Sequence, residues 1–328
     1  MNSQIDTNTS EAINLDMKDR KILYELDMDA RQPISQIAKK VRLSKETVNY
    51  RIKQLEKKGI IKGYYAALDL SKLGYLFCRI FLRFQNASQE KENEIINFCK
   101  KYYSIGWMYT IDGPWDLVFA IYPKNIGEIE QFCDKLIYRY GKFILNKTVS
   151  IATTIWHFKN NYLYEKKDYS EAILGEESKA KIDEKDIELL RLLAKNARFP
   201  IIDLAQKIHL SPNAIKYRIK NLVQNKIILA FRADININAL GYEHYKVFLQ
   251  LQNLDQIKLD NLIDFFRKNN NVIYITKPLG PADLEFEIIL KNEKELHVFL
   301  RELRNRFDIV KECQPALLYN EIMLNYLP

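Results

Sequence analysis

The sequence predicts an α+β protein in which one unit, a winged or plain helix-turn-helix domain followed by a βαββαβ domain, occurs twice. Apolar residues recur with the 3.6-residue period of helices early in each half, and with the two-residue period of strands further on. Residues also return at a constant offset of 167, so that Asp16 matches Asp183. Other matched pairs are Pro33 and Pro200, Tyr50 and Tyr217, Gly74 and Gly241, and Asp116 and Asp283. Matches this far apart in one frame indicate a tandem duplication.

Three helices are predicted at the start of the first half. Asp16 is placed to cap the first of them, and Ile22 and Leu26 lie on its inward face. Pro33 then breaks the chain, and residues 34–41 form a short helix. A longer amphipathic helix follows after a tight turn, which is the order of a helix-turn-helix.

The third helix, within residues 43–58, has the features of a DNA recognition helix. Ser44 is a natural N-cap, and Val48, Ile52 and Leu55 form one apolar stripe. The opposite face carries hydrogen-bonding and cationic side chains that reach phosphates and base edges in such helices. These are Glu46, Asn49, Tyr50, Lys53 and Lys57.

Residues 210–224 repeat this helix in the second half. Ser211 caps it, and Pro212 stands at the first helical position, where a missing N–H group costs nothing. The outward face consists of Asn213, Lys216, Tyr217 and Lys220. Any amphipathic surface helix has such a stripe, but two basic copies in the same helix-turn-helix order favour DNA binding.

The rest of each half alternates strands and helices. In the first half a strand over residues 62–70 leads out of the helices, and residues 77–84 alternate between two different faces. The expected order is strand 77–84, helix 90–102, strand 105–110, strand 116–122, helix 126–140 and strand 143–158. This βαββαβ order is that of a ferredoxin-like domain.

These patterns divide the chain into six segments. They are a flexible tail (1–14), a helix-turn-helix domain (15–62), a ferredoxin-like domain (63–158), a linker (159–181), a second helix-turn-helix domain (182–229) and a second ferredoxin-like domain (230–328). The linker is polar and charged, and we expect one helical turn near residues 169–174.

Composition narrows the functional classes. The chain has 328 residues and a net charge of +8, which is compatible with an anionic partner but does not establish one. The four cysteines and four histidines are dispersed without metal-ligand spacing, and no apolar run is long enough to span a bilayer. No catalytic triad, phosphate-binding glycine loop or carboxylate pair is present. We therefore expect a cytoplasmic protein that is not an enzyme, with reduced cysteines, no cofactor and no metal.

An ordered set of short motifs runs through the first half. It comprises Leu15-Asp16, Ala30-Arg31-x-Pro33, Leu43-Ser44, Tyr50-Arg51-Ile52-x-x-Leu55, Gly59-Ile60-Ile61, Leu73-Gly74-Tyr75 and Gly113-x-x-Asp116. With these motifs the chain resembles the Lrp/AsnC (feast/famine) family of prokaryotic transcription regulators, over nearly everything outside the tail and linker. The resemblance implies a regulator that binds double-stranded DNA. Members usually carry one unit per chain and pair through their ferredoxin-like domains, so this chain would contain both halves of such a dimer and would associate further into homo-oligomers.

The candidate DNA-binding residues lie on the two recognition helices. They are Ser44, Lys45, Asn49, Tyr50, Arg51, Lys53, Lys57, Ser211, Asn213, Lys216, Tyr217, Arg218 and Lys220. For Arg51 and Arg218, which border the apolar stripe, a salt bridge to acids of the first helix is an equal alternative. The two outward faces differ, since Glu46 is matched by Asn213, so we expect an asymmetric DNA site.

The resemblance also implies an amino-acid effector near the Gly-x-x-Asp turn, in members that have one. The candidate effector residues are Gly113, Trp115, Asp116, Gly280 and Asp283. A hairpin turn, in which Gly supplies a positive φ and Asp caps, explains the same residues. Trp115 is matched by Ala282, so two equal pockets are not expected.

Two functions from other classes stay open. Sirohaem decarboxylases resemble the same architecture, but the histidines of this chain fall in unrelated elements. A metabolite-sensing scaffold without DNA contact is the other alternative.

Overall fold

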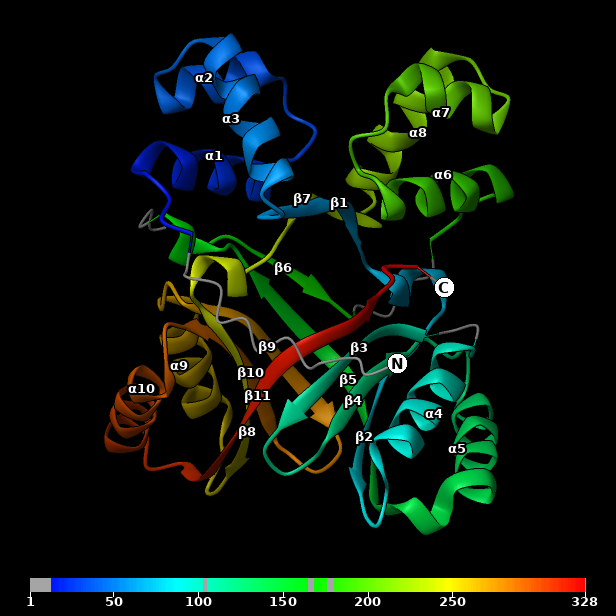
Figure 1. The fold of residues 1–328 in the computed structure, drawn as a ribbon, viewed down its shortest axis with the longest axis vertical. Coiled ribbons are helices and arrows are strands. Elements are labelled where there is room, and N and C mark those ends of the chain that lie inside the picture. Colours follow the sequence, from blue (N-terminus) through cyan, green and yellow to red (C-terminus); the bar gives the residue numbers. More distant parts are fainter. Residues whose placement is uncertain (1–12, 103–104, 165–167, 176–179, 328) are drawn as a thin grey trace.

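The structure is a computed structural model, which describes residues 13–102, 105–164, 168–175 and 180–327. Two helical domains lie at one end of the molecule, and a β-barrel flanked by helices lies at the other (Figure 1). The predicted α+β class and the tandem order of its domains are confirmed. Most of the expected tail, residues 1–12, lies outside the described residues.

The first helix-turn-helix domain begins and ends at the predicted caps. Its helices are α1 (Met17–Met28), α2 (Ile34–Val41) and α3 (Lys45–Lys57). The side chain of Asp16 accepts from the backbone N–H of Asp19, and that of Ser44 accepts from the N–H of Thr47. After α3 the chain turns at Gly59, whose φ of 68° is readily adopted only by glycine.

The second helix-turn-helix domain repeats this arrangement. Its helices are α6 (Glu184–Lys195), α7 (Ile201–Ile208) and α8 (Pro212–Gln224). Asp183 and Asp186 form a reciprocal capping box at the start of α6, and Ser211 caps α8. The counterpart of Gly59 is Lys226, which takes the left-handed conformation (φ 55°) without the help of glycine.

The first ferredoxin-like domain has the predicted βαββαβ order. Its elements are β2 (Phe77–Phe84), α4 (Gln89–Lys100), β3 (Ile105–Asp112), β4 (Leu117–Ile121), α5 (Ile126–Tyr140) and β5 (Ile144–Phe158). The strands lie side by side in the order β5-β2-β4-β3, all antiparallel. α4 and α5 bury their apolar faces, which include Ile95, Cys99 and Phe132, against one side of this sheet.

The second ferredoxin-like domain is built in the same way. Its elements are β8 (Glu243–Leu251), α9 (Gln256–Arg267), β9 (Val272–Leu279), β10 (Leu284–Leu290), α10 (Glu293–Arg306) and β11 (Val310–Leu324). The strand order is β11-β8-β10-β9. Among the described residues, no helix combines the length and apolarity that crossing a lipid bilayer requires.

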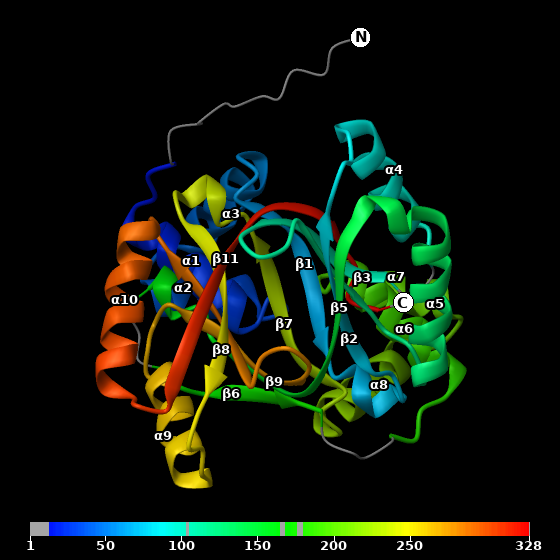
Figure 2. The same cartoon turned by 90° about the horizontal axis from the view of Figure 1, so that it is seen from below.

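The two sheets join at both edges into one closed barrel (Figure 2). β5 and β11 are each 15 residues long, and each pairs with its own domain along one part and with the other domain along another. β11 pairs with β3, and β5 pairs with β9, so all four sheet edges are occupied. The dimer-like pairing expected between subunits is thus made inside one chain.

A two-stranded ribbon of β1 (Ile61–Leu68) and β7 (Ile228–Ile235) lies between the barrel and the helical domains. Tyr65 stands opposite Arg232 in this ribbon. These two residues are matched by the 167-residue offset, so the ribbon lies on the approximate two-fold axis of the duplication.

Each helix-turn-helix domain packs on the ribbon strand of the other half. The N–H of Ala30 donates to the carbonyl of Phe231 (2.7 Å), and the N–H of its counterpart Ala197 donates to that of Tyr64 (2.9 Å). The apolar core of the first domain also includes Leu240 from the second half. The helical domains are therefore seated on a shared platform rather than attached by free linkers.

Residues 159–181 differ from the expected linker where they are described. Tyr162 and Leu163 are buried in the core of the first helix-turn-helix domain. The helical turn expected near residues 169–174 is wrong: β6 (Glu171–Leu174) is a strand that pairs with β5. β5 extends beyond β2 and leaves backbone groups unpaired there, and an extended segment satisfies them.

A buried ion pair fixes the first helical domain to the ribbon. Arg232 of β7 donates from Nε and Nη2 to the two carboxylate oxygens of Asp27 of α1, at 2.7 and 2.6 Å. Both side chains are almost fully buried, and Asn160 donates two further hydrogen bonds to the same carboxylate.

Asp27→Ala should lower the free energy of unfolding by about 3–5 kcal/mol, because Arg232 would keep a buried charge without its partner. Denaturant unfolding measures this change. Glu188→Ala, which removes an exposed ion pair with Lys185, is the matched control and should cost less than about 1 kcal/mol. A loss as small as that of the control would show that the buried pair does not anchor the domain.

Candidate nucleic-acid interface and central cavity

α3 presents a polar face to solvent. Val48, Ile52 and Leu55 are buried, as the apolar stripe predicts. Tyr50 is 63% exposed at the middle of the opposite face. The other exposed candidates on this helix and its cap are Ser44, Lys45, Lys53 and Lys57, while Asn49 is half-buried.

α8 presents the equivalent face. Tyr217 is 66% exposed, like its counterpart on α3. The exposed candidates beside it are Ser211, Asn213, Lys216 and Lys220. Figure 1 shows the two helical domains on either side of the β1–β7 ribbon at the same end of the molecule.

Arg51 and Arg218 are held by acids of their own domains. Arg51 Nη1 lies 2.7 Å from a carboxylate oxygen of Asp16 and 2.9 Å from one of Asp19. The hydrogen bonds that Arg51 donates to Asp19 and Asp16 raise its pKa. The salt bridge that the sequence left as an alternative is therefore the contact present in the structure.

The second half repeats this ion-pair arrangement. Arg218 Nη1 lies 2.8 Å from Asp183 and 2.7 Å from Asp186. The hydrogen bonds that Arg218 donates to the two acids raise its pKa. In both halves the arginine joins the recognition helix to the cap of the first helix, and contact of these arginines with DNA stays a prediction.

The Asp residues of the two Gly-x-x-Asp turns hold hairpins together. Asp116 accepts from the backbone N–H of Phe84 (2.7 Å) and from Arg83 (2.9 Å). Asp283 accepts from the N–H of Leu251 (2.7 Å). An effector at these turns stays a prediction.

The residues around the two turns differ between the halves. Gly113 has the predicted positive φ (148°). For Gly280 that expectation is wrong: it has no positive φ, and a Cβ there would lie 3.0 Å from Ser150. Trp115 is buried against Phe81 and Phe248, with ring centroids 4.8 Å apart in both pairs. Ala282, the counterpart of Trp115, is buried as well.

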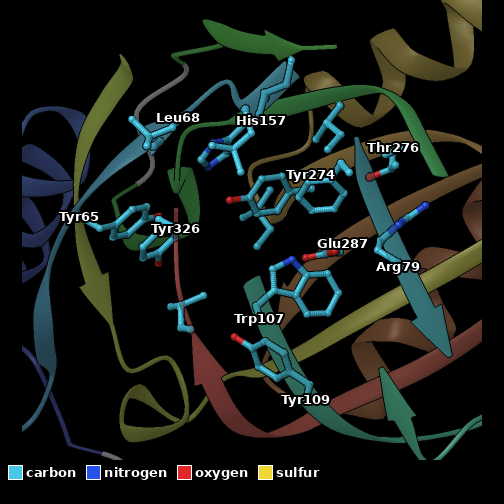
Figure 3. Close-up of a pocket in the computed structure, with 18 of the residues that line it drawn as sticks. Tyr65, Leu68, Arg79, Trp107, Tyr109, His157, Tyr274, Thr276, Glu287 and Tyr326 are labelled. Atoms are coloured by element: carbon cyan, nitrogen blue, oxygen red, sulfur yellow. The ribbon is translucent and has the colours of Figure 1, made fainter. Parts of the chain in front are cut away.

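A cavity of about 1110 Å³ lies between the ribbon and the barrel, and both halves line it (Figure 3). No local sequence pattern predicts this cavity. Its wall is rich in aromatic rings, namely Tyr65, Tyr75, Phe77, Trp107, Tyr109, Tyr122, Tyr162, Tyr274 and Tyr326. Tyr65 and Tyr326 are stacked with ring centroids 3.7 Å apart.

Charged side chains form the barrel side of the cavity. Arg79 donates to Glu285 and, at 2.6 Å, to the hydroxyl of Ser150. Lys246 lies 2.9 Å from both Glu285 and Glu287. Arg79, Glu285 and Lys246 are almost fully buried.

Glu287 lines the cavity together with Arg79 and Lys246 of this layer. His244 Nε2 lies 2.9 Å from the carboxylate of Glu287. Burial raises the pKa of Glu287, but the charge of Lys246 and the contact with His244 outweigh burial and hold this pKa below its ordinary value. Glu287 is therefore ionised at neutral pH.

Two histidines line the same cavity, although the sequence places them in unrelated elements. His157 of β5 stacks on Tyr274 of β9, with ring centroids 4.2 Å apart. Burial holds the pKa of His157 well below 6.5, so this imidazole is neutral at neutral pH. His244 of β8 is the second. Only the pairing between β5 and β9, which joins the two halves, brings His157 here.

Comparison with solved structures gives a match over the whole chain. The crystal structure of the siroheme decarboxylase NirDL matches with a TM-score of 0.63 and 14% sequence identity, covering 94% of this chain and 92% of that one. NirDL in co-complex with an iron-uroporphyrin III analogue matches with a TM-score of 0.62 and 13% identity. At this identity the likeness concerns the fold alone.

Comparison of sequences identifies both helical domains. Residues 15–62 match the model for winged helix-turn-helix DNA-binding domains, and residues 182–223 match that for AsnC-type helix-turn-helix domains. The HTH-type transcriptional regulator FL11 of Pyrococcus horikoshii is 33% identical over 122 residues, which are 37% of this chain and 80% of that protein. The regulator LrpC of Bacillus subtilis is 30% identical over 146 residues, which are 44% of this chain and 91% of that protein. With two such domains, each followed by a ferredoxin-like domain, the chain belongs to the Lrp/AsnC family of regulators.

Proposed function

We propose that this protein is a sequence-specific transcription regulator that binds double-stranded DNA with both helix-turn-helix domains of a single chain. The observation that carries the proposal is the pair of equivalent exposed faces on α3 and α8, centred on Tyr50 and Tyr217. These faces belong to domains at the same end of the molecule. A protein with two such helices can place them in successive major grooves, about 34 Å apart.

The anchoring of the helical domains supports this mode of binding. Each domain is hydrogen-bonded to the ribbon strand of the other half, and Asp27 of the first domain is also ion-paired to the ribbon. Little conformational freedom is therefore lost when both domains engage DNA, which favours affinity. Association of several copies and an amino-acid effector at the Gly-x-x-Asp turns are further expectations of this function.

The exposed side chains take different roles in the proposed complex. Lys53 and Lys57 of α3, with Lys216 and Lys220 of α8, contact phosphates. Asn49, Tyr50, Asn213 and Tyr217 reach base edges or sugars. Arg51 and Arg218 act indirectly, because their ion pairs hold the recognition helices on the first helices.

Replacing Lys53 and Lys220 with Ala should weaken binding to every DNA sequence. Each lost phosphate contact should reduce the slope of log K against log salt concentration by about 0.9. Titrations at several salt concentrations measure that slope. Lys135→Ala with Lys294→Ala, on the exposed faces of α5 and α10, is the control of equal charge. An unchanged slope in the first variant would remove these lysines from the interface.

The recognition faces predict an asymmetric operator. Glu46 of α3 is matched by Asn213 of α8, and Asn49 is matched by Lys216. A carboxylate near the start of the helix repels phosphate but accepts from cytosine N4, whereas an Asn amide pairs with adenine. The two half-sites should therefore differ in sequence.

Selection from a randomised duplex pool should yield two different half-sites for the natural protein. The double variant Glu46→Asn, Asn49→Lys makes the face of α3 resemble that of α8, so it should select half-sites that are more alike. Glu46→Gln, which removes only the charge, is the matched control. Two identical inverted half-sites for the natural protein would contradict the proposed roles of these side chains.

A second function, decarboxylation of a sirohaem-type tetrapyrrole, is favoured by two observations. The chain shares its whole fold with NirDL, and its cavity contains His157 and His244. The charged side chains of the cavity are an argument against this function. Arg79, Arg232 and Lys246 are each paired with a carboxylate of this chain, so they are not free to receive the carboxylates of such a substrate.

This second function predicts that added sirohaem acquires a shifted Soret band on binding and loses carboxyl groups as CO₂. His157→Ala and His244→Ala should each abolish the product, while Lys53→Ala should have no effect on it. Absorption spectroscopy and mass spectrometry of the pigment follow the two steps. If neither the band nor the mass changes at saturating protein, the decarboxylase function is excluded.

A further inference from the structure

We infer that the central cavity is a binding site for a flat aromatic molecule that is uncharged or carries one positive charge. The ring system would lie against the aromatic wall contributed by the first half, and a hydrogen-bond donor would meet Glu287 of the second half. The inference concerns a ligand of the DNA-free protein, so it goes beyond the proposed function and does not depend on it.

The size and lining of the cavity support a ligand of this shape. A volume of about 1110 Å³ slightly exceeds the usual range of small-molecule sites, roughly 300–1,000 Å³, so a ligand of several fused rings fits. Trp107 and Tyr109 of β3 line the cavity side by side, and Tyr274, Tyr65 and Tyr326 line it as well (Figure 3). Aromatic faces stack on flat rings and also attract cations.

The cavity departs from the two-fold symmetry of the duplication. Phe77 of the first half is matched by His244, and Ala120 is matched by Glu287. Across the axis, Trp107 is matched by Tyr274. The second half thus contributes a carboxylate and an imidazole at positions where the first half has alanine and phenylalanine, and this imidazole lies beside Tyr109 of the first half.

This difference selects an unsymmetrical ligand. The strands that carry these residues still pair in the same registers: Arg79 stands opposite Ala120, and Lys246 stands opposite Glu287. Because the backbone is the same in the two halves, the barrel itself does not require different side chains there. The difference suits a molecule with one apolar end and one polar end.

The ion pairs set the charge of the ligand. Lys62 lies 3.4 Å from Asp234 and 2.8 Å from Glu321. The buried lining cations Arg79, Arg232 and Lys246 are each paired with acids of this chain. Lys124, a further lining cation among the described residues, is exposed to solvent and stacks over Tyr75.

Among the described lining residues an anionic ligand would therefore find no free buried cation, and its desolvation would be uncompensated. The carboxylates of Glu287 and Glu321 are paired as well, with Lys246 and Lys62, but a single positive charge would lie among aromatic faces, which attract cations. An uncharged ring system would lose little hydration free energy on entering the cavity.

Three probes with one ring system test this inference: 9-aminoacridine, which is a cation at neutral pH, acridine, which is uncharged, and acridine-9-carboxylate, which is an anion. Fluorescence titration of the DNA-free protein should show one site per chain for the first two probes. The anion should bind at least tenfold more weakly. Binding of the anion as tightly as the cation, or of sirohaem in competition with acridine, would overturn the inference.

Variants locate the probe. Trp107→Ala should lower the affinity for 9-aminoacridine and for acridine at least tenfold. Trp107→Phe, which keeps an aromatic ring, should retain most of the affinity of the natural protein. Glu287→Gln should remove the preference for the cation over acridine, while Lys246 keeps Glu285 as its partner. Tyr138→Ala is the control, because this ring is 84% exposed on the outer face of α5, and it should leave the affinity for all three probes unchanged.

Thermal melting of each variant distinguishes loss of the site from loss of the fold. If folded Trp107→Ala binds the cation and acridine as the natural protein does, the probe lies elsewhere and the inference is wrong. Failure of all three probes to bind the natural protein would also overturn it, without bearing on DNA binding.

Discussion

The pairing of the two ferredoxin-like sheets at both edges is the constraint on which the rest of the structure depends. Each sheet alone would expose the backbone groups of two edge strands, and such edges recruit other chains. Here β3 pairs with β11, and β5 pairs with β9, so one chain closes its own barrel. This closure fixes the two halves relative to each other and, through the β1–β7 ribbon, fixes the platform of the helical domains.

Closure also gives the barrel an interior whose two ends differ. At one end Phe81, Trp115 and Phe248 fill it with aromatic rings. Towards the other end, the buried ion pairs of Arg79 and Lys246 lie between this aromatic cluster and the cavity. A ligand in the cavity would touch the strands on which both helical domains are seated. The arrangement thus offers a direct physical route between a small molecule and the spacing of the recognition helices.

Fusion of two units releases each half from the symmetry that identical subunits impose. In a homodimer a substitution appears on both sides of the axis, so equivalent positions could not hold Phe77 in one half and His244 in the other. In the present chain, equivalent positions hold different residues on the recognition faces and in the cavity. Buried ion pairs follow the same pattern, since Arg232 and Asp27 on one side have Tyr65 and Ala194 as their counterparts on the other.

The sequence by itself determined the local elements and their repetition, because caps, turn residues and apolar periods act over a few neighbouring positions. Ser44, Ser211 and the two apolar stripes predicted the recognition helices, and the 167-residue offset predicted the duplication. Only the tertiary structure decided which distant side chains meet. The pairing of Arg51 with Asp16 depends on how two helices pack, the strand at residues 171–174 depends on the open edge of β5, and the cavity depends on the register between halves. Such contacts join residues far apart in the chain, so no local pattern encodes them.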